Sequence, residues 1–178
     1  MAGFVARPPR VKTRGYNGQK PRPGLAELAR RGFNINVNRL ISMRFRSHTR
    51  LYVHLVWATW DRAPLITPAI RDRIYPMMQR HAADLGAHVI AIGGIEDHVH
   101  VLVRFPSRLA IAELVQRMKG ASSYLATRVM GEIFRWQGSY GAFTLSERGL
   151  DRVRDYVLNQ EAHHRDGTTH PRLEITEE

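Results

Sequence analysis

The 178-residue sequence contains no cysteine. The absence of thiols excludes a disulfide scaffold, a cysteine nucleophile and a thiolate zinc site, so any metal would need His, Asp, Glu, Gln or Asn ligands. Long apolar runs are also absent: His88–Ile92 is far shorter than the ~20 residues of a membrane-spanning helix, and Met1–Gly15 lacks the apolar stretch of a signal peptide. We therefore expect a soluble, cytoplasmic protein with no membrane partner.

Acidic residues are scarce at the N-terminus. Residues 1–50 contain 12 Lys and Arg but only Glu27 as an acid, whereas residues 51–178 contain 15 charges of each sign. Nearly all of the net charge of +11 therefore lies in a basic leader, residues 1–46, whose Pro, Gly and Arg content predicts disorder. Such a leader favours a polyanionic partner, because Lys and Arg displace counterions from phosphates. The alternatives are a solvated tail and translation that begins at Met43.

The remaining sequence is long enough for one folded domain, which we place at residues 47–166, followed by a C-terminal tail, residues 167–178. Apolar periodicity predicts strands at 51–60, 88–93, 98–105 and 142–145, and helices at 68–85, 109–130 and 150–164. Thr67 and Pro68 are typical of a helix start, and Gly86 of a helix end. This order predicts an α+β, ferredoxin-like split βαβ fold: an antiparallel sheet with helices on one face, the other face open, and an extra C-terminal helix.

Two histidines alternate with valines on the strand predicted at 98–105. Since residues two apart share a face, Val99, Val101 and Val103 can enter the core while His98 and His100 point to the open face. Such neighbours are roughly 7 Å apart, close enough for both imidazoles to reach one metal ion. The alternative is a pair of exposed histidines without a ligand role.

Tyr156 and Gln160 lie four residues apart in the last predicted helix, so a phenol and an amide project from one helical face. The alternatives are a core aromatic residue and a solvated amide.

Five motifs, taken in order, carry a family resemblance. They are Asp97-His98-Val99-His100-Val101-Leu102-Val103, Met118-Lys119-Gly120, Trp136-Gln137, Tyr140-Gly141-Ala142-Phe143 and the stretch from Tyr156 to His164. In order and spacing they resemble the single-tyrosine HUH transposases of the insertion-sequence-two-hundred type, which include the REP-associated tyrosine transposases. The resemblance covers Thr49 to Arg165 and none of the basic leader.

The resemblance implies an enzyme that cleaves and rejoins single-stranded DNA beside hairpins through a 5′-phosphotyrosine. It makes Tyr156 the nucleophile on the C-terminal helix, and His98, His100 and Gln160 the ligands of one divalent metal. It also implies a homodimer in which the tyrosine helix can serve the partner's histidines. Neutral imidazole and amide ligands suit Mn²⁺ better than Mg²⁺, and we expect activity with either ion.

Basic and aromatic side chains are the candidates for contact with DNA. The candidates are Arg50, Arg104, Arg117, Lys119 and, as a stacking surface, Trp136, with Arg46 and Arg128 as further basic residues. Two other functions fit the same residues. One is a non-catalytic single-stranded nucleic-acid-binding protein that uses the open sheet face, and the other is a metal hydrolase with water as the nucleophile. A transposase of this kind is either mobile or domesticated.

Overall fold

The computed structural model describes residues 48–176, so the expected basic leader and Met43 lie outside the described residues. Its centre is a four-stranded antiparallel sheet in the order β2-β3-β1-β4. The strands are β1 (Tyr52–Ala58), β2 (His88–Gly94), β3 (His98–Arg104) and β4 (Gly141–Leu145). This topology confirms the predicted α+β, split βαβ fold.

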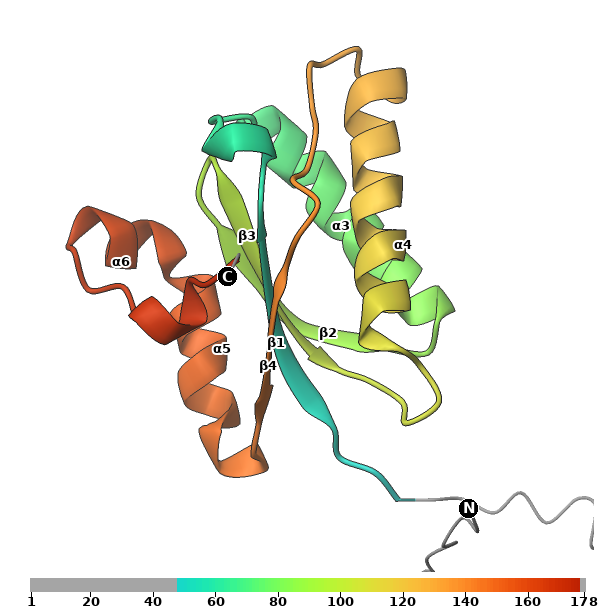
Figure 1. The fold of residues 1–178 in the computed structure, drawn as a ribbon, viewed down its shortest axis with the longest axis vertical. Helices are drawn as coiled ribbons and strands as arrows, with labels where there is room; N and C mark the ends of the chain where they lie inside the picture. Colours follow the sequence, from blue (N-terminus) through green and yellow to red (C-terminus); the bar gives the residue numbers. More distant parts are fainter. Residues whose placement is uncertain (1–47, 177–178) are drawn as a thin grey trace, which may run out of the picture. The chain divides into compact units, whose positions relative to one another are not determined.

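Two helices cover one face of the sheet (Figure 1). Helix α3 (Pro68–Asp84) starts as predicted: the Thr67 side chain accepts a hydrogen bond from the backbone nitrogen of Ile70 at 3.3 Å. The helix is followed by Gly86 at φ +78°, a conformation that favours glycine. Helix α4 (Ile111–Tyr124) continues into a π-helical turn, Leu125–Val129. No helix among residues 48–176 is long and apolar enough to cross a membrane.

The main core lies between this helical layer and the sheet. The sheet contributes alternate residues of its two central strands, and the helices contribute the residues of their inner faces. The core includes Val53, Leu55, Trp57, Val99, Val101 and Val103 from the strands, and Ile74, Met78, Leu114 and Met118 from α3 and α4. The pleat therefore turns the intervening residues, among them His54, His98 and His100, to the opposite face.

That opposite face carries the C-terminal helices, α5 (Leu150–Leu158) and α6 (Gln160–Arg165) (Figure 1). Val157 of α5 forms a second small core with Ala91 and Leu102 of the sheet. The face predicted to be open is thus partly covered by the helix that carries Tyr156.

A break at Asn159 replaces the single helix expected over 150–164. Asn159 has φ −108° and ψ 26°, outside the helical range. Its side-chain amide donates to the carbonyl of Asp155 at 2.7 Å, and the Gln160 amide donates to the carbonyl of Tyr156 at 3.2 Å. Side-chain amides that bond nearby carbonyls offer the backbone an alternative to the regular helical ladder. The break brings Gln160 to the start of a separate helix.

Helix α5 approaches β2 so closely that only glycine fits at position 93. A Cβ atom on Gly93 would collide with the carbonyl oxygen of Val157, the residue after Tyr156. Gly93 therefore helps to fix the height of Tyr156 above the sheet.

We predict that Gly93→Ala lowers the free energy of unfolding by roughly 1–3 kcal/mol, the usual range for overpacking, because α5 must shift to admit the methyl group. Gly120→Ala is the matched control: Gly120 lies within α4 with no atom near its added Cβ, so that variant should be as stable as the parent or more so. Urea unfolding measures both. Equal stability of the two variants would contradict the close packing of α5.

Candidate active site

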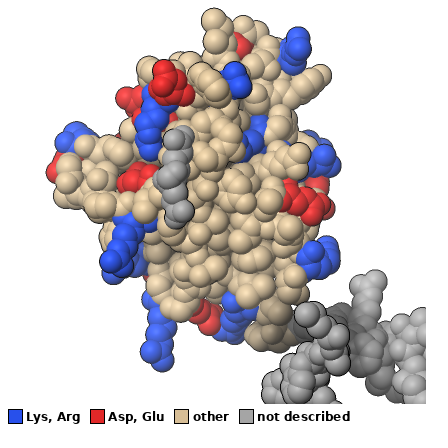
Figure 2. All heavy atoms as spheres, in the orientation of Figure 1, with Lys and Arg blue, Asp and Glu red and all other residues tan. Residues whose placement is uncertain are grey.

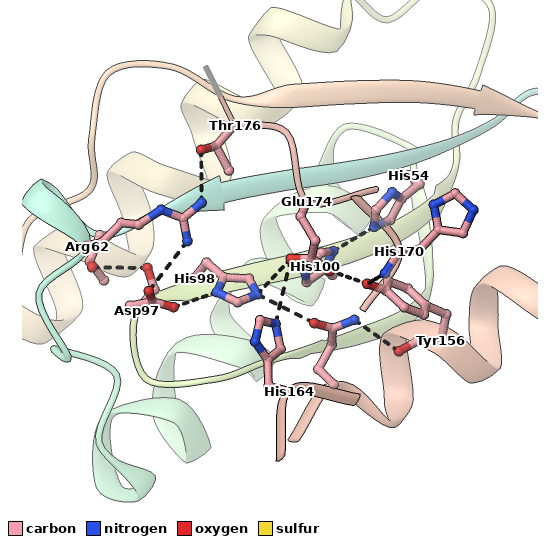
Figure 3. Close-up of polar contacts among 12 residues, drawn as sticks. His54, Arg62, Asp97, His98, His100, Tyr156, His164, His170, Glu174 and Thr176 are labelled. Carbon is pink, nitrogen blue, oxygen red and sulfur yellow. Dashed lines mark hydrogen bonds and ion pairs between the residues drawn. The ribbon is translucent and has the colours of Figure 1, made fainter. Parts of the chain in front are cut away.

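The histidine pair lies where the alternation predicts, on the sheet face opposite the main core. His98 and His100 are 1% and 0% exposed, and their ring centroids are 4.9 Å apart. Figure 3 shows both rings grouped with Tyr156, His164 and Glu174, which come from α5, α6 and the C-terminal segment. Residues distant in sequence thus form one polar cluster.

One ring nitrogen of each histidine is engaged on the outside of this cluster. Nδ1 of His98 is hydrogen-bonded to a carboxylate oxygen of Asp97 at 2.5 Å, and Nδ1 of His100 to Nε2 of His54 at 2.8 Å. These contacts orient the rings, so that Nε2 of His98 and Nε2 of His100 face the middle of the cluster. Sequence reasoning missed His54 as a site residue, although the alternation along β1 assigns it to this face.

The C-terminal helices complete the predicted set. The side-chain oxygen of Gln160, a residue only 1% exposed, is 3.5 Å from Nε2 of His98. The ring of Tyr156 stands edge-on to His100 with centroids 5.9 Å apart. Its hydroxyl donates to Glu174 and accepts a hydrogen bond from the backbone nitrogen of His170 at 3.0 Å. The structure therefore brings His98, His100, Tyr156 and Gln160 together within a single chain.

Glu174 is the residue that sequence reasoning missed entirely. Its Oε2 atom lies 3.3 Å from Nε2 of His98, 3.2 Å from Nε2 of His100 and 3.7 Å from Nε2 of His164. The segment expected as a separate tail thus returns to the site, with a short 3₁₀ turn at Pro171–Leu173. No periodicity or motif in this segment distinguishes Glu174 from the other acidic residues near the C-terminus.

Burial and the two carboxylates set the charges of the cluster. Burial alone would lower the pKa of His98, but its contacts with Asp97 and Glu174 outweigh burial and raise the pKa to about 9. Burial dominates at His54, whose pKa falls to about 3, and at His100, whose pKa is also lowered. For Glu174, burial would raise the pKa, but the neighbouring His100 and His98 outweigh it and lower the pKa. At neutral pH, His98 is therefore cationic beside an anionic Glu174.

The donor atoms fit a divalent cation. Nε2 of His98, Nε2 of His100 and a carboxylate oxygen of Glu174 all lie within 4.8 Å of one another. Nε2 of His100 is buried and makes no hydrogen bond with any residue in the described part of the chain. A buried nitrogen without a hydrogen bond is costly, and a metal ion would satisfy it. Imidazole nitrogen with carboxylate or amide oxygen is a donor set typical of first-row divalent metals.

Two of the candidate DNA contacts, Lys119 and Trp136, lie outside this cluster, at the loop before β4. The Lys119 ammonium donates to the carbonyls of Gln137, Gly138 and Ser139 at 2.6, 3.3 and 3.0 Å, and burial lowers its pKa to about 8. The Trp136 ring is buried against Trp57 and Phe134, and its indole nitrogen donates to the Ser122 hydroxyl at 2.9 Å. Both side chains hold the loop before β4, and Trp136 is only 7% exposed.

The arginine candidates are exposed but do not converge. Arg50 pairs with Glu147 at 2.5 Å, Arg104 ends β3, and Arg117 lies on α4 in the helical layer. The face seen in Figure 2 carries Lys and Arg scattered among Asp and Glu. The structure therefore does not bring these residues to the His98–Tyr156 cluster.

Comparison with known proteins gives the family. The model of the family "Transposase IS200 like" matches residues 47–160. The chain belongs to the IS200-like transposases. It is therefore a member of a family of DNA-cleaving enzymes, which agrees with the resemblance drawn from the motifs.

Relatives of this IS200-like transposase are known in sequence and structure. The ISDra2 transposase TnpA of Deinococcus radiodurans is 28% identical over 119 residues, which are 62% of this chain and 84% of the relative. A crystal structure assigned to a transposase of Deinococcus radiodurans R1 is 25% identical, with a TM-score of 0.52 over 66% of this chain and 96% of that one. A REP-associated tyrosine transposase bound to a REP hairpin is 12% identical, with a TM-score of 0.53 over 72% and 76% of the chains, a likeness of fold.

We predict that Asp97→Asn lowers the pKa of His98 in the metal-free protein by roughly 1–3 pH units, because an adjacent opposite charge is removed. A raised folded-state pKa contributes stability below the unfolded pKa, which is lost as pH rises through about 9. The variant should therefore lose more stability at neutral pH than above pH 9.

NMR titration of the histidine ring protons and unfolding at several pH values measure this effect. Asp72→Asn is the control, since Asp72 is an exposed carboxylate outside the cluster. An unchanged His98 titration in Asp97→Asn would contradict the account.

Proposed function

We propose that this IS200-like transposase cleaves and rejoins single-stranded DNA beside hairpins, through a covalent 5′-phosphotyrosine on Tyr156. We further propose that His98, His100 and Gln160 bind the divalent metal, Mg²⁺ or Mn²⁺. One observation carries the proposal. The carboxylate of Glu174 contacts the Tyr156 hydroxyl with one oxygen and approaches Nε2 of both histidines with the other. The nucleophile and the metal-binding atoms are therefore separated by the width of one carboxylate.

The reaction exchanges one phosphoester bond for another. The Tyr156 oxygen forms a bond to phosphorus, the bond from phosphorus to the 3′ oxygen breaks, and the phenolic proton is balanced by the proton gained at the 3′-hydroxyl. Because the phosphoester is conserved in the adduct, the reverse step can join strands without another energy source. A bound divalent cation would supply a Lewis acid that stabilises charge on the scissile phosphate.

The protein's own groups hold the tyrosine ready for this step. Burial, and then the hydrogen bond to Glu174, raise the pKa of Tyr156, so its hydroxyl is protonated in the metal-free protein. The hydroxyl is oriented by Glu174 on one side and by the backbone nitrogen of His170 on the other. On the far side of the metal-binding atoms, Asp97 and His54 fix the two imidazole rings. We propose Asp97 and His54 as positioning residues.

The proposed substrate is DNA with a hairpin or palindromic end. A structural neighbour is described as bound to a REP hairpin, and it shares the fold of this chain. We propose that exposed Arg50, Arg104 and Arg117, together with the basic leader, contact phosphates along the strand. Lys119 and Trp136 would act indirectly, through the loop before β4 that they hold.

We also propose a homodimer. The cluster of His98, His100, Tyr156 and Gln160 is assembled within one chain, which is the arrangement for action in cis. The break at Asn159 and the loop before α5 are the places where the tyrosine helix could be exchanged between two copies.

We predict that the protein forms a covalent adduct with end-labelled single-stranded DNA that contains flanking palindromes, in the presence of Mn²⁺ and not of EDTA. Tyr156→Phe removes the attacking oxygen, so no adduct forms. His98→Ala should lower adduct formation by about 100-fold or more, because loss of a metal ligand should cost more than the roughly 10- to 100-fold loss typical of a residue that only hydrogen-bonds a ligand. A denaturing gel measures the adduct.

Tyr124→Phe is the matched control, because Tyr124 is an exposed tyrosine on α4 and its variant should react like the parent. Cleavage that persists in Tyr156→Phe without an adduct would contradict the proposal and indicate a hydrolase. Metal-independent binding without cleavage would indicate a binding protein.

A further inference from the structure

We propose that Glu174 is a fourth protein ligand of the metal centre and that the same carboxylate holds the Tyr156 hydroxyl beside the metal. This inference rests on the proposed function, since it concerns the same metal, and it adds a residue outside the motif set. The C-terminal segment is then part of the active site.

The distances are those of neighbouring ligands on one ion. Ligand atoms bound about 2.0–2.2 Å from a metal lie about 2.8–3.6 Å apart when they are adjacent in octahedral or tetrahedral geometry. Oε2 of Glu174 is 3.3 Å from Nε2 of His98 and 3.2 Å from Nε2 of His100. Both separations therefore fall within the range expected for adjacent ligands, and one cation placed between the three atoms would be bound by all of them.

The segment around Glu174 is fastened to the site on several sides. Arg62 donates to the Thr176 hydroxyl at 3.4 Å while its other terminal nitrogen bonds Asp97 at 3.4 Å (Figure 3). The backbone at Ile175 lies against Gly141 of β4, where a Cβ atom would collide with the Ile175 carbonyl oxygen. The Glu174 side chain is only 19% exposed. Its position therefore also depends on the contacts of the two residues that follow it, and not on the histidines alone.

A carboxylate changes the chemistry of the metal centre. His98, His100 and Gln160 supply no negative charge, whereas Glu174 adds a hard, anionic oxygen of the kind that Mg²⁺ and Mn²⁺ prefer. Four protein ligands would leave two of the six positions that an octahedral ion takes, enough for substrate oxygen. The second oxygen of Glu174 accepts from Tyr156. The same side chain would thus bind the metal and position the nucleophile.

The experiment is a titration of the full-length protein with Mn²⁺ in the absence of DNA. Binding is measured by isothermal titration calorimetry and, independently, by the EPR signal of free Mn²⁺. We expect Glu174→Gln to weaken Mn²⁺ binding by roughly tenfold or more, the scale of loss when a metal site is deprived of a supporting group. Glu174→Asp keeps the charge but retracts it by one methylene, so its affinity for Mn²⁺ should fall between those of the parent protein and Glu174→Gln. Glu132→Gln, an exposed glutamate after α4, should bind like the parent. Thermal unfolding verifies that each variant is folded.

Each outcome has a distinct meaning. Weaker binding in folded Glu174→Gln, with Glu132→Gln unchanged, supports the inference. Unchanged affinity in Glu174→Gln overturns it and leaves the three-ligand site intact. Tighter Mn²⁺ binding with faster DNA cleavage also overturns it, because the carboxylate would then be an occupant that metal and phosphate must displace. Absence of Mn²⁺ binding in the parent protein contradicts both this inference and the metal site of the proposed function.

Discussion

The alternation of side chains along β3 is the constraint on which the candidate site depends. Because β3 is a central strand, paired with β1 on one side and β2 on the other, its register cannot shift without moving Val99, Val101 and Val103 out of the main core. The energy of burying those valines therefore also fixes His98 and His100 on the other face. A slip of one residue would place the imidazoles in the apolar core against α3 and α4 and the valines among the polar groups of the cluster.

Burial of so many polar groups on one sheet face costs free energy wherever a group lacks a partner. A buried polar group without a partner costs about 1–3 kcal/mol. Here Asp97 and His54 engage the outer nitrogens of the two rings, and Glu174 faces the inner ones. The outer contacts keep each imidazole oriented whether or not a metal is present. A site organised in this way does not need to rearrange its ligands when the ion binds, which favours affinity.

The parts of the fold that depend on local pattern could be predicted from the sequence. Alternation predicted β1 and β3, a short apolar run predicted β2, and the Thr67–Pro68 start and Gly86 end of α3 followed from backbone chemistry. The pairing of His98 with His100, and of Tyr156 with Gln160, followed from the two- and four-residue periods, and the ordered motifs predicted that these pairs meet.

Features that depend on contacts between distant segments could not be predicted in this way. The break at Asn159 was missed for a local reason, because it is accompanied by side-chain amides that bond carbonyls one turn back, and helical periodicity does not register such contacts. Trp136 turns inward because its indole nitrogen donates to the Ser122 hydroxyl, and Lys119 turns inward because its ammonium donates to three loop carbonyls. Glu174 reaches the site through a segment without periodicity. Arg62 bonds this segment at Thr176, and the absence of a side chain at Gly141 leaves room for its Ile175 carbonyl.

The central claim is that one metal ion lies between His98, His100 and the Tyr156 hydroxyl. The most direct test of this claim is a crystal structure of the protein soaked with Mn²⁺, with anomalous scattering to locate the ion. The account predicts one strong anomalous peak bonded to Nε2 of His98 and Nε2 of His100, on the side facing Tyr156. A peak at another place, or none beside these two nitrogens at saturating Mn²⁺, would contradict it.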